Sequence, residues 1–488
     1  MVQGMASSDE KKAKKHVVIY APPAMSSHLV SMVELGKLLA AHGLEVTVVV
    51  GGRTDDGKTA GDAAAGSFAE GAAAAAHPEL SFHSLPPVAR PPDVPAHDYV
   101  VQAFELARAS NSNLREFLRA ASPFPAALVL DFFCGSALDV GADLGIPTYF
   151  FFTSSVAGLA ELLYHPLIHE QTPLSLRDLG GGHLHAPGIP PIPVGDLPAA
   201  YLDRDGPGNR LFLSLSEQMC NSQGLIVNSF RSLEPRATEA IVSGLCTPPG
   251  RRTPPLHCIG PVVKLEEAAG ASRHECLAWL DAQPEASVVF LCFGSLGRFS
   301  AEQTRQVARG LEASGQRFLW VVRSPPGEDG GPGREPPADP DLDALLPAGF
   351  QERTKDRGFV VRSWAPQVDV LRHRAAGAFV THCGWNSVLE AVLMGGVPML
   401  AWPMYAEQRM NKVFLVEEMR LAVALEGYDR EMVRDEEVAT KVRWLMESDG
   451  GRELRERTWA AMRRAGEALG DGGESRTSLL ELVRQWKS

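Results

Sequence analysis

The sequence lacks the features that mark several classes of protein. It has no apolar run of about 18 residues, so no membrane span is expected. Beyond the N-terminal residues it has no long Lys/Arg tract, and its formal net charge is -12. The missing basic tract and the negative net charge argue against a nucleic acid or an anionic membrane surface as the main partner. They leave open a small anion bound at a local site.

Cysteine pairs are also missing. The seven cysteines are scattered and include no CxxC pair, which argues against both a disulfide framework and a structural zinc site. The polar N-terminus is followed by an apolar stretch, VVIYA, that is too short for a signal-peptide core. A protein of the reducing cytosol is therefore expected, with a cytoplasmic location.

Short apolar runs alternate with helical patterns in the first half of the chain. HVVIYA (16–21) is followed by a helical pattern starting at Leu29 and then by LEVTVVV (44–50). This β-α-β order indicates the start of a parallel sheet. Further strands are predicted in AALVLD, IPTYFFF and LIVNSF, at 126–131, 146–152 and 225–230.

The alternation restarts near Ser287. SVVFLCFGS is followed by a helical stretch over 301–314 and by the runs FLWVVR, FVVRSW, GAFVTH and PMLAWP. The restart predicts an α/β protein with two doubly wound domains, at 1–255 and 256–465, and a final helix over 466–488 that packs back on the first. The Pro- and Gly-rich segment 247–261 is the predicted linker.

The segment THCGWNS (381–387) places polar groups where a predicted strand turns into a helix. Ligands of open α/β sheets bind outside the carboxyl ends of the strands, and a helix N-terminus attracts phosphate. Asn386 and Ser387 suit a helix cap, and His382 can add a donor. From these residues alone, a capped helix with a buried His and Trp remains an equal alternative.

The flanking residues favour the ligand site. The segment from Trp364 to Gln408, WAPQVDVLRHRAAGAFVTHCGWNSVLEAVLMGGVPMLAWPMYAEQ, closely resembles the signature box of plant family 1 UDP-sugar glycosyltransferases. The resemblance extends through HLVSMVELGKLL, LVLDFF, FLCFGSLGRFS and EQRMNKVFLVEEM. It implies the GT-B architecture, in which two Rossmann-like domains face a cleft and the C-terminal domain holds the nucleotide sugar.

The resemblance also implies a set of residues that bind the UDP-sugar. These are Ser295, Trp364, Ala365, Gln367, His382, Trp385, Asn386, Ser387, Glu390, Tyr405, Glu407 and Gln408. Trp364 and the backbone of Ala365 would hold the uracil, and Gln367 with Glu390 would hold the ribose. The diphosphate would be held by Ser295, His382, Asn386 and Ser387. The sugar hydroxyls would be bound by Glu407 and Gln408. Gln408 implies glucose as the sugar.

Two positions depart from the family pattern. Six residues, AVLMGG, separate Glu390 from Val397, where the family usually has five. This extra residue is expected to threaten the ribose contact of Glu390. Ser27 stands where the family usually has glycine, directly before the expected catalytic histidine.

The expected catalytic residues are His28 and Asp131. His28 lies between the first strand and the first helix, and a helix N-terminus disfavours a charged imidazole. Asp131 ends a strand at the same sheet edge, where it can orient that imidazole. Position alone is more typical of a capping or packing histidine. The resemblance implies that His28 takes a proton from the acceptor hydroxyl, which displaces UDP with inversion at the anomeric carbon. No metal or other cofactor is expected.

The acceptor is less well defined by the sequence. Phe132, Phe133 and Phe152 are candidate walls of its pocket, which suits a flat phenolic or flavonoid-like molecule, the common acceptor class of the family. The expected partners are thus UDP-glucose, or a related UDP-sugar, and a small aromatic acceptor, bound by a monomer.

Two other functions are considered. GRTDDGKT (52–59) matches the P-loop pattern GxxxxGK[ST] and follows a predicted strand, as in an NTPase. Asp55 and Asp56 would however repel a phosphate held in that loop. A non-catalytic nucleotide-sugar binder would use the same donor residues without turnover.

Overall fold

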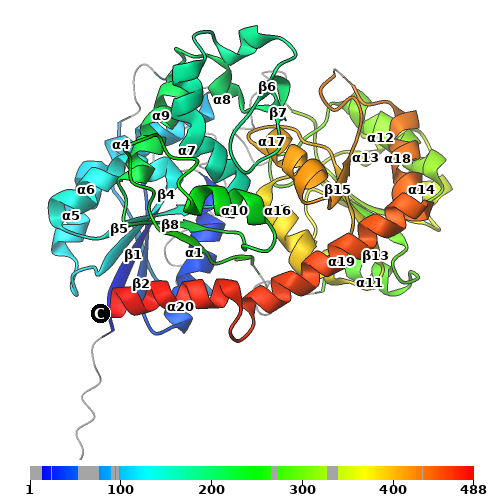
Figure 1. Ribbon diagram of the computed structural model, residues 1–488. Coiled ribbons are helices and arrows are strands. Elements are labelled where there is room, and N and C mark those ends of the chain that lie inside the picture. Colours follow the sequence, from blue (N-terminus) through cyan, green and yellow to red (C-terminus); the bar gives the residue numbers. More distant parts are fainter. Residues whose placement is uncertain are drawn as a thin grey trace, which may run out of the picture.

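The computed structural model describes residues 14–23, 25–52, 76–89, 94, 98–264, 273–326, 339–430 and 432–488. Two α/β halves lie side by side, each built around its own parallel sheet (Figure 1). This confirms the predicted fold class of two doubly wound domains. Among the helices of the described residues, none combines the length and apolarity that a membrane crossing requires.

The first sheet owes its layers to the alternation of side chains along buried strands. Its parallel strands run in the order β3 (Ser81–Ser84), β2 (Glu45–Val50), β1 (His16–Ala21), β4 (Ala127–Asp131), β5 (Thr148–Phe152), β8 (Gly224–Val227) and β9 (Leu256–Cys258). In β1, Val17 and Ile19 pack into one apolar cluster, while Val18 and Tyr20 pack into the cluster on the opposite face. Such two-sided burial is the reason why parallel strands read as continuous apolar runs.

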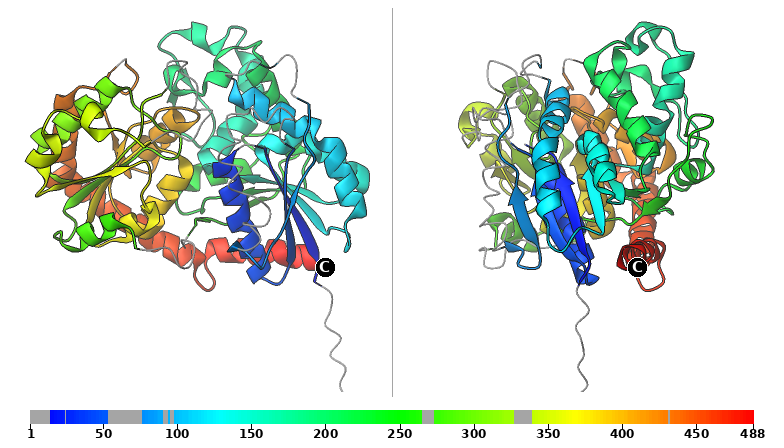
Figure 2. Two further views of the ribbon diagram at one scale, coloured as in Figure 1. Left: turned by 180° about the vertical axis from the view of Figure 1, so that it is seen from behind. Right: turned by 90° about the vertical axis from the view of Figure 1, so that its left-hand side faces the viewer.

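Helices cover both faces of this sheet (Figure 2). They are α1 (Ser26–Ala41), α4 (Tyr99–Ala109), α5 (Asn111–Ala120), η1 (Phe132–Ala137), α6 (Leu138–Leu144), α7 (Val156–Gln171), η2 (Leu176–Leu179), α8 (Ala199–Leu202), α9 (Pro207–Cys220) and α10 (Pro235–Val242). A small antiparallel pair, β6 (His183–Leu184) and β7 (Ile192–Pro193), leads into η3 (Val194–Asp196).

The second sheet repeats the plan. Its parallel order is β12 (Gly358–Arg362), β11 (Arg317–Val322), β10 (Val288–Cys292), β13 (Ala376–Thr381), β14 (Met399–Ala401) and β15 (Ala422–Ala424). The surrounding helices are α11 (Glu275–Asp281), α12 (Ala301–Ser314), α13 (Leu342–Leu345), α14 (Phe350–Thr354), α15 (Gln367–Arg372), α16 (Trp385–Glu390), η4 (Ala391–Gly395), α17 (Gln408–Val413), η5 (Phe414–Glu418), α18 (Asp435–Glu447) and α19 (Asp449–Leu469).

The last helix, α20 (Glu474–Lys487), follows α19 and runs beneath the first half of the chain (Figure 1). Leu479, Leu482 and Trp486 are buried in the apolar cluster that also holds β1 and α1. Ser475 donates to the Gly260 carbonyl at 2.6 Å. The chain therefore ends on the half in which it began.

The predicted linker and the predicted limit of the first domain need correction. Leu256–Cys258 forms β9, which pairs with β8 at the edge of the first sheet. The first α/β unit therefore extends past residue 255. Pro255 accepts the N–H of Leu225, so the proline contributes a carbonyl and its missing N–H does no harm at an edge.

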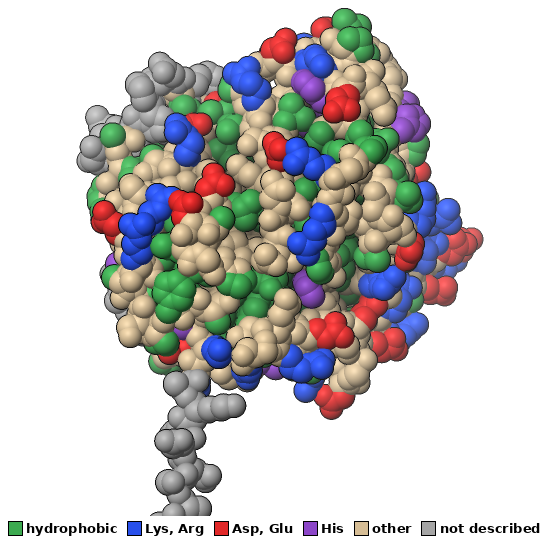
Figure 3. Space-filling model, turned by 60° about the vertical axis from the view of Figure 1, so that its left-hand side comes forward, with side chains coloured by type: hydrophobic (Ala, Val, Ile, Leu, Met, Phe, Trp, Pro, Cys, Tyr) green, Lys and Arg blue, Asp and Glu red, His purple; other side chains and the backbone are tan. Residues whose placement is uncertain are grey.

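Charges of both signs are mixed on the face of the molecule in Figure 3, where Lys and Arg side chains lie among Asp and Glu side chains. That face, as far as its residues are described, offers no extended basic patch to a polyanion.

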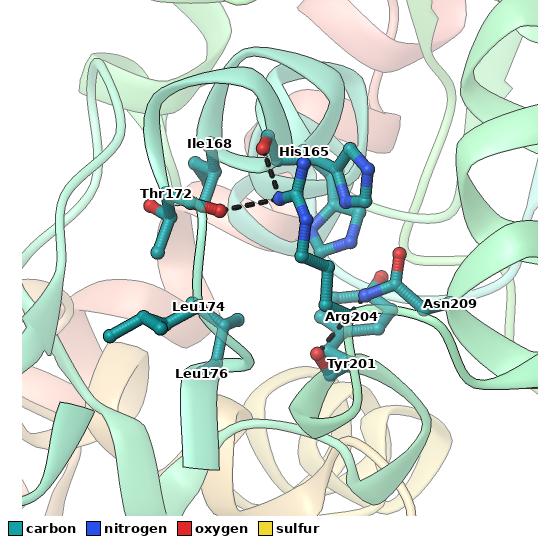
Figure 4. A pocket seen from close by; sticks show the side chains of 9 residues that line it. His165, Ile168, Thr172, Leu174, Leu176, Tyr201, Arg204 and Asn209 are labelled. Atoms are coloured by element: carbon teal, nitrogen blue, oxygen red, sulfur yellow. Dashed lines mark hydrogen bonds between the residues drawn. The ribbon is translucent and has the colours of Figure 1, made fainter. Parts of the chain in front are cut away.

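A small hollow lies at the C-terminal end of α7 (Figure 4). The Arg204 guanidinium enters it and donates to the carbonyls of His169 and Thr172. These carbonyls belong to a helix end that lacks intrahelical partners, so the arginine acts as a cap. The remaining space of about 10 Å³ holds roughly one water molecule. The hollow is therefore a small packing gap, too small for a substrate.

Candidate active site

The predicted catalytic pair is formed at the carboxyl end of the first sheet. His28 stands in the first turn of α1, and its Nδ1 lies 2.8 Å from Asp131 Oδ2. Asp131 is fully buried at the end of β4, and its other oxygen accepts the N–H of Phe133 at 2.9 Å. Thr153 Oγ1 lies 3.3 Å from the same histidine nitrogen. With Nδ1 held in this way, Nε2 is the ring nitrogen left for a reacting group.

The environment of His28 acts on its pKa in two directions. Burial lowers the pKa, but the charge and hydrogen bond of Asp131 and the charge of Glu407 outweigh burial, and the pKa is raised above its usual value. Asp131 therefore affects the pKa of His28 more than the helix N-terminus that the sequence analysis considered. The imidazole side chain remains 15% exposed, so a ligand can reach it.

A cavity of about 270 Å³ lies between the two halves, near the start of α1. Val30 of α1 lines it on one side, only two residues from His28. The opposite wall holds six of the predicted donor residues, namely Ser295, Trp364, Ala365, Gln367, Ser387 and Glu390. Trp364 is 54% exposed and meets the His274 ring edge-on at 5.9 Å, so its indole offers a flat surface to the cavity.

Gln367, Ser387 and Glu390 are joined by hydrogen bonds. The Gln367 amide donates to Glu390 Oε2 at 2.6 Å and to Ser387 Oγ at 2.9 Å. Burial raises the pKa of Glu390 to about 7, although the Gln367 hydrogen bond opposes this. A carboxyl group poised near neutrality thus faces the cavity.

The side chain of His382 is held between two glycines. A Cβ added to Gly294 or to Gly384 would lie 2.4 Å from His382 Nε2, closer than any Cβ can stand. Burial, with a contribution from Arg323, lowers the pKa of His382 to about 4. The ring is therefore neutral at pH 7. Its buried Nδ1 has no hydrogen-bond partner among the described residues.

Strained backbone occurs at three turns of this region. Ser363, Cys383 and Ala406 have φ of 61°, 65° and 55°, the left-handed region that residues other than glycine avoid. Ser363 precedes Trp364, Cys383 follows His382, and Ala406 precedes Glu407. Such strain persists where the surrounding structure enforces it, and it is typical of functional sites.

Aromatic rings surround His28 on the side of the first domain. Phe132 and Phe133 each have their ring centre 5.1 Å from the imidazole, and Phe152 lies 5.2 Å from Phe132. Phe133 and Phe152 are buried, whereas Phe132 is half-buried. Of the three predicted walls of the acceptor pocket, Phe132 is therefore the one with the most accessible surface.

Comparison with known proteins identifies the family. A family model described as UDP-glucoronosyl and UDP-glucosyl transferase matches residues 259–449. The chain is 44% identical to anthocyanidin 5,3-O-glucosyltransferase of a Rosa hybrid cultivar, over 96% of this chain and 98% of that one. It is 43% identical to phloretin 2'-O-glucosyltransferase of Malus domestica, with the same coverage. The chain belongs to the UDP-glycosyltransferase family.

A solved structure supports the same conclusion. Phytolacca americana UGT2, complexed with UDP-2fluoro-glucose and pterostilbene, matches with a TM-score of 0.83 and 33% identity, over 97% of this chain and 100% of that one. The present UDP-glycosyltransferase thus has the GT-B arrangement of two Rossmann-like domains.

Two predicted donor residues of this UDP-glycosyltransferase have other partners. Trp385 is buried in the core of the second domain, and its indole N–H donates to the Asn228 carbonyl at 2.7 Å. The Trp385 side chain therefore packs between the domains, and its part in donor binding stays a prediction. The Asn386 amide donates to Ser31 Oγ of α1 at 3.0 Å, so it too joins the domains.

The predicted sugar-contacting residues lie at the start of α17, outside the lining of the cavity. Gln408 is buried, and its Oε1 accepts the N–H groups of Met404 and Tyr405 at 2.9 and 3.0 Å. Tyr405 is half-buried, with its ring centre 6.4 Å from that of His382. Glu407 is half-buried, and its charge contributes to raising the pKa of His28.

The extra residue after Glu390 is absorbed within a helix. Residues 391–395 form the π-helical turn η4, in which the Gly396 N–H reaches the Ala391 carbonyl at 3.0 Å. A π turn holds one more residue than an α turn, so the insertion widens the helix after Glu390. Glu390 accepts a hydrogen bond from Gln367, and both residues line the cavity, as the predicted ribose contact requires.

Arg323 and Lys264 also line the cavity, and sequence reasoning missed both. Arg323 follows β11, and its Nε donates to the Ser363 carbonyl at 2.9 Å, which supports the turn before Trp364. A signal was present, because a cation directly after a buried strand lies at the ligand-binding edge of such a sheet.

Two further expectations concern metals and the P-loop pattern. Among the described residues, no group of three or more His, Cys, Asp or Glu side chains is arranged to hold a metal ion. Of the P-loop pattern at 52–59, the residues after Gly52 lie outside the described part of the chain.

Proposed function

We propose that this UDP-glycosyltransferase transfers glucose from UDP-glucose to a hydroxyl of a small phenolic, flavonoid-like acceptor, with inversion at the anomeric carbon. The observation that carries the proposal is the position of α1. Its first turn holds His28 against Asp131, and two residues later Val30 borders the donor cavity. A base and a cavity of about 270 Å³ thus lie at the same end of one helix.

The donor is held by groups suited to each of its parts. The exposed indole of Trp364 stacks on the uracil, which the backbone of Ala365 pairs with. Gln367 and Glu390 bind the ribose hydroxyls, since a carboxylate accepts from a diol. Ser295, Ser387 and the neutral His382 donate to the diphosphate.

The proposed reaction is a direct displacement. Asp131 fixes Nδ1 of His28, so Nε2 takes the proton of the acceptor hydroxyl. The acceptor oxygen bonds to the anomeric carbon as the bond from that carbon to the diphosphate oxygen breaks. Asp131 stabilises the imidazolium that forms, and the donors around the diphosphate stabilise the negative charge on the departing UDP.

The acceptor class is supported by the aromatic surroundings of His28 and by the similar proteins. The names of the Rosa and Malus relatives specify an anthocyanidin and phloretin, and the Phytolacca structure holds pterostilbene. Half-buried Phe132 offers a ring face to such a molecule. The glucose donor is supported by the relatives' description as glucosyltransferases and by Gln408.

The test is a panel of phenolic acceptors incubated with UDP-glucose and read by mass spectrometry, with the wild type beside His28→Ala. A gain of one hexose in the wild type and its loss in the variant support the proposal. Binding of UDP-glucose with no transfer to any phenol would indicate a nucleotide-sugar binder instead.

We further propose a cytoplasmic, monomeric enzyme that needs no metal. None of the seven cysteines forms a disulfide, and all are buried, a state that suits a reducing compartment. Light scattering reads the mass in solution, and turnover in excess EDTA tests the metal independence.

A further inference from the structure

The helix α17 belongs to the second domain by chain order but packs into the first. Met410 and Val413 on this helix are buried in the apolar cluster of the first domain, as is Phe414 directly after it. Figure 1 shows α17 between the two halves. A shift of the first domain against this helix would therefore disturb a packed core, which tolerates little displacement.

A buried ion pair fixes the same helix. Lys412 Nζ lies 2.7 Å from Asp196 Oδ2, with both side chains nearly inaccessible. The other carboxylate oxygen accepts the Tyr428 hydroxyl at 2.7 Å, and Arg409 donates to the Gly195 carbonyl at 3.0 Å. A buried pair is tolerated when its remaining hydrogen-bonding capacity is satisfied, and Asp196 meets this condition from two elements of the other domain.

The opposite end of α17 contacts two turns that carry predicted donor residues. Glu407 is the N-cap and Gln408 the first residue of the helix, and the latter holds the turn at Met404. Asn411 donates to the Cys383 carbonyl at 3.1 Å, in the turn that follows His382. The helix α17 thus joins the first-domain loop at Gly195 and Asp196 to two turns of the second domain. One is the turn at Met404, and the other is the turn at Cys383.

We propose that Asp196 is a positioning residue for glycosyl transfer. By holding Lys412 it fixes α17, and with it Glu407 and Gln408, so that the sugar faces the proton acceptor at His28. The inference rests on the proposed function. It adds that a residue of the first domain helps to set the position of the sugar. A displacement of about 1 Å between reacting groups costs roughly a hundredfold in rate, and this loop sets that spacing.

The test compares three variants with the wild type. They are the single variant Asp196→Asn, the double variant Asp196→Asn/Lys412→Met, and the control Arg236→Gln. Asparagine still accepts from Tyr428 but leaves Lys412 without a counter-charge. The double variant removes the unpaired charge, which often restores stability. Arg236 pairs with Glu418 across the same two domains, but its guanidinium is exposed, so it serves as the matched control.

Four quantities are measured: kcat for transfer, the rate of UDP-glucose hydrolysis, the Kd values of UDP and UDP-glucose, and Tm. In Asp196→Asn we expect kcat to fall tenfold to a hundredfold. The ratio of the Kd of UDP-glucose to the Kd of UDP should rise. The Kd of UDP should change less than twofold. The double variant should recover Tm but not kcat, and Arg236→Gln should match the wild type.

Two results would overturn the inference. One is an unchanged kcat together with an unchanged ratio of the two Kd values in Asp196→Asn. The other is recovery of kcat together with Tm in the double variant, because the loop would then act only through stability. Failure of the proposed function is distinguishable, since it appears as absent phenol transfer in the wild type. The two Kd values still decide the inference in that case.

Discussion

Glu390 should make the affinity for the donor depend on pH near neutrality. Burial raises its pKa to about 7, and the ionised form is the one that accepts hydrogen bonds from a ribose diol. With a pKa of about 7, roughly a tenth of the carboxyl groups are ionised at pH 6 and nine tenths at pH 8. If only this form binds, Kd falls about tenfold over that range, or about 1.4 kcal/mol.

The assay is calorimetric titration of UDP-glucose at pH 6, 7 and 8. UDP-glucose is preferred to UDP because its phosphates carry no group that titrates in this range, whereas a terminal phosphate titrates near pH 6. The pKa of His382, at about 4, keeps that ring neutral throughout. Glu390→Gln should bind more weakly at pH 8 and lose the pH dependence. A flat wild-type curve, or the same slope in the variant, would refute the reasoning.

Three further predictions follow from the site. Asp131→Asn removes the carboxylate that raises the pKa of the proposed base, so the acidic limb of the kcat/KM profile should move to lower pH while the plateau falls roughly 10²-fold; an unmoved limb would contradict the pairing. Trp364→Ala should weaken UDP binding by about 1–3 kcal/mol of lost stacking, whereas Trp459→Ala, which removes an indole that is 46% exposed elsewhere, should not change Kd. Gly384→Ala places a Cβ 2.4 Å from the neighbouring imidazole and should lower kcat/KM about 100-fold; wild-type kinetics would show that the ring is free to move.

The sequence predicts best the parts of this fold that depend on local pattern. The buried strands are marked by continuous apolar runs, and α12 spans Ala301–Ser314 as the helical pattern indicates. The meeting of His28 and Asp131 also follows, because each ends or follows a strand at the same sheet edge. Pairing between distant edges is harder to predict: β9 lies in a Pro-rich segment, and only its partner β8 makes it a strand.

The roles of individual box residues depend on contacts between the domains, which local pattern does not encode. Trp385 and Asn386 stand in the predicted donor-binding motif, yet their side chains bond to Asn228 and Ser31 of the other domain. The effect of the inserted residue could not be read from its length alone, since a π turn absorbs it.

The role of His28 is tested most directly by separating chemistry from donor binding. In His28→Ala, transfer to a phenolic acceptor should fall by about 10²–10⁴-fold. The Kd of UDP-glucose should stay within about twofold, because the proposed donor contacts lie in the other domain. Full transfer activity in this variant would contradict the account.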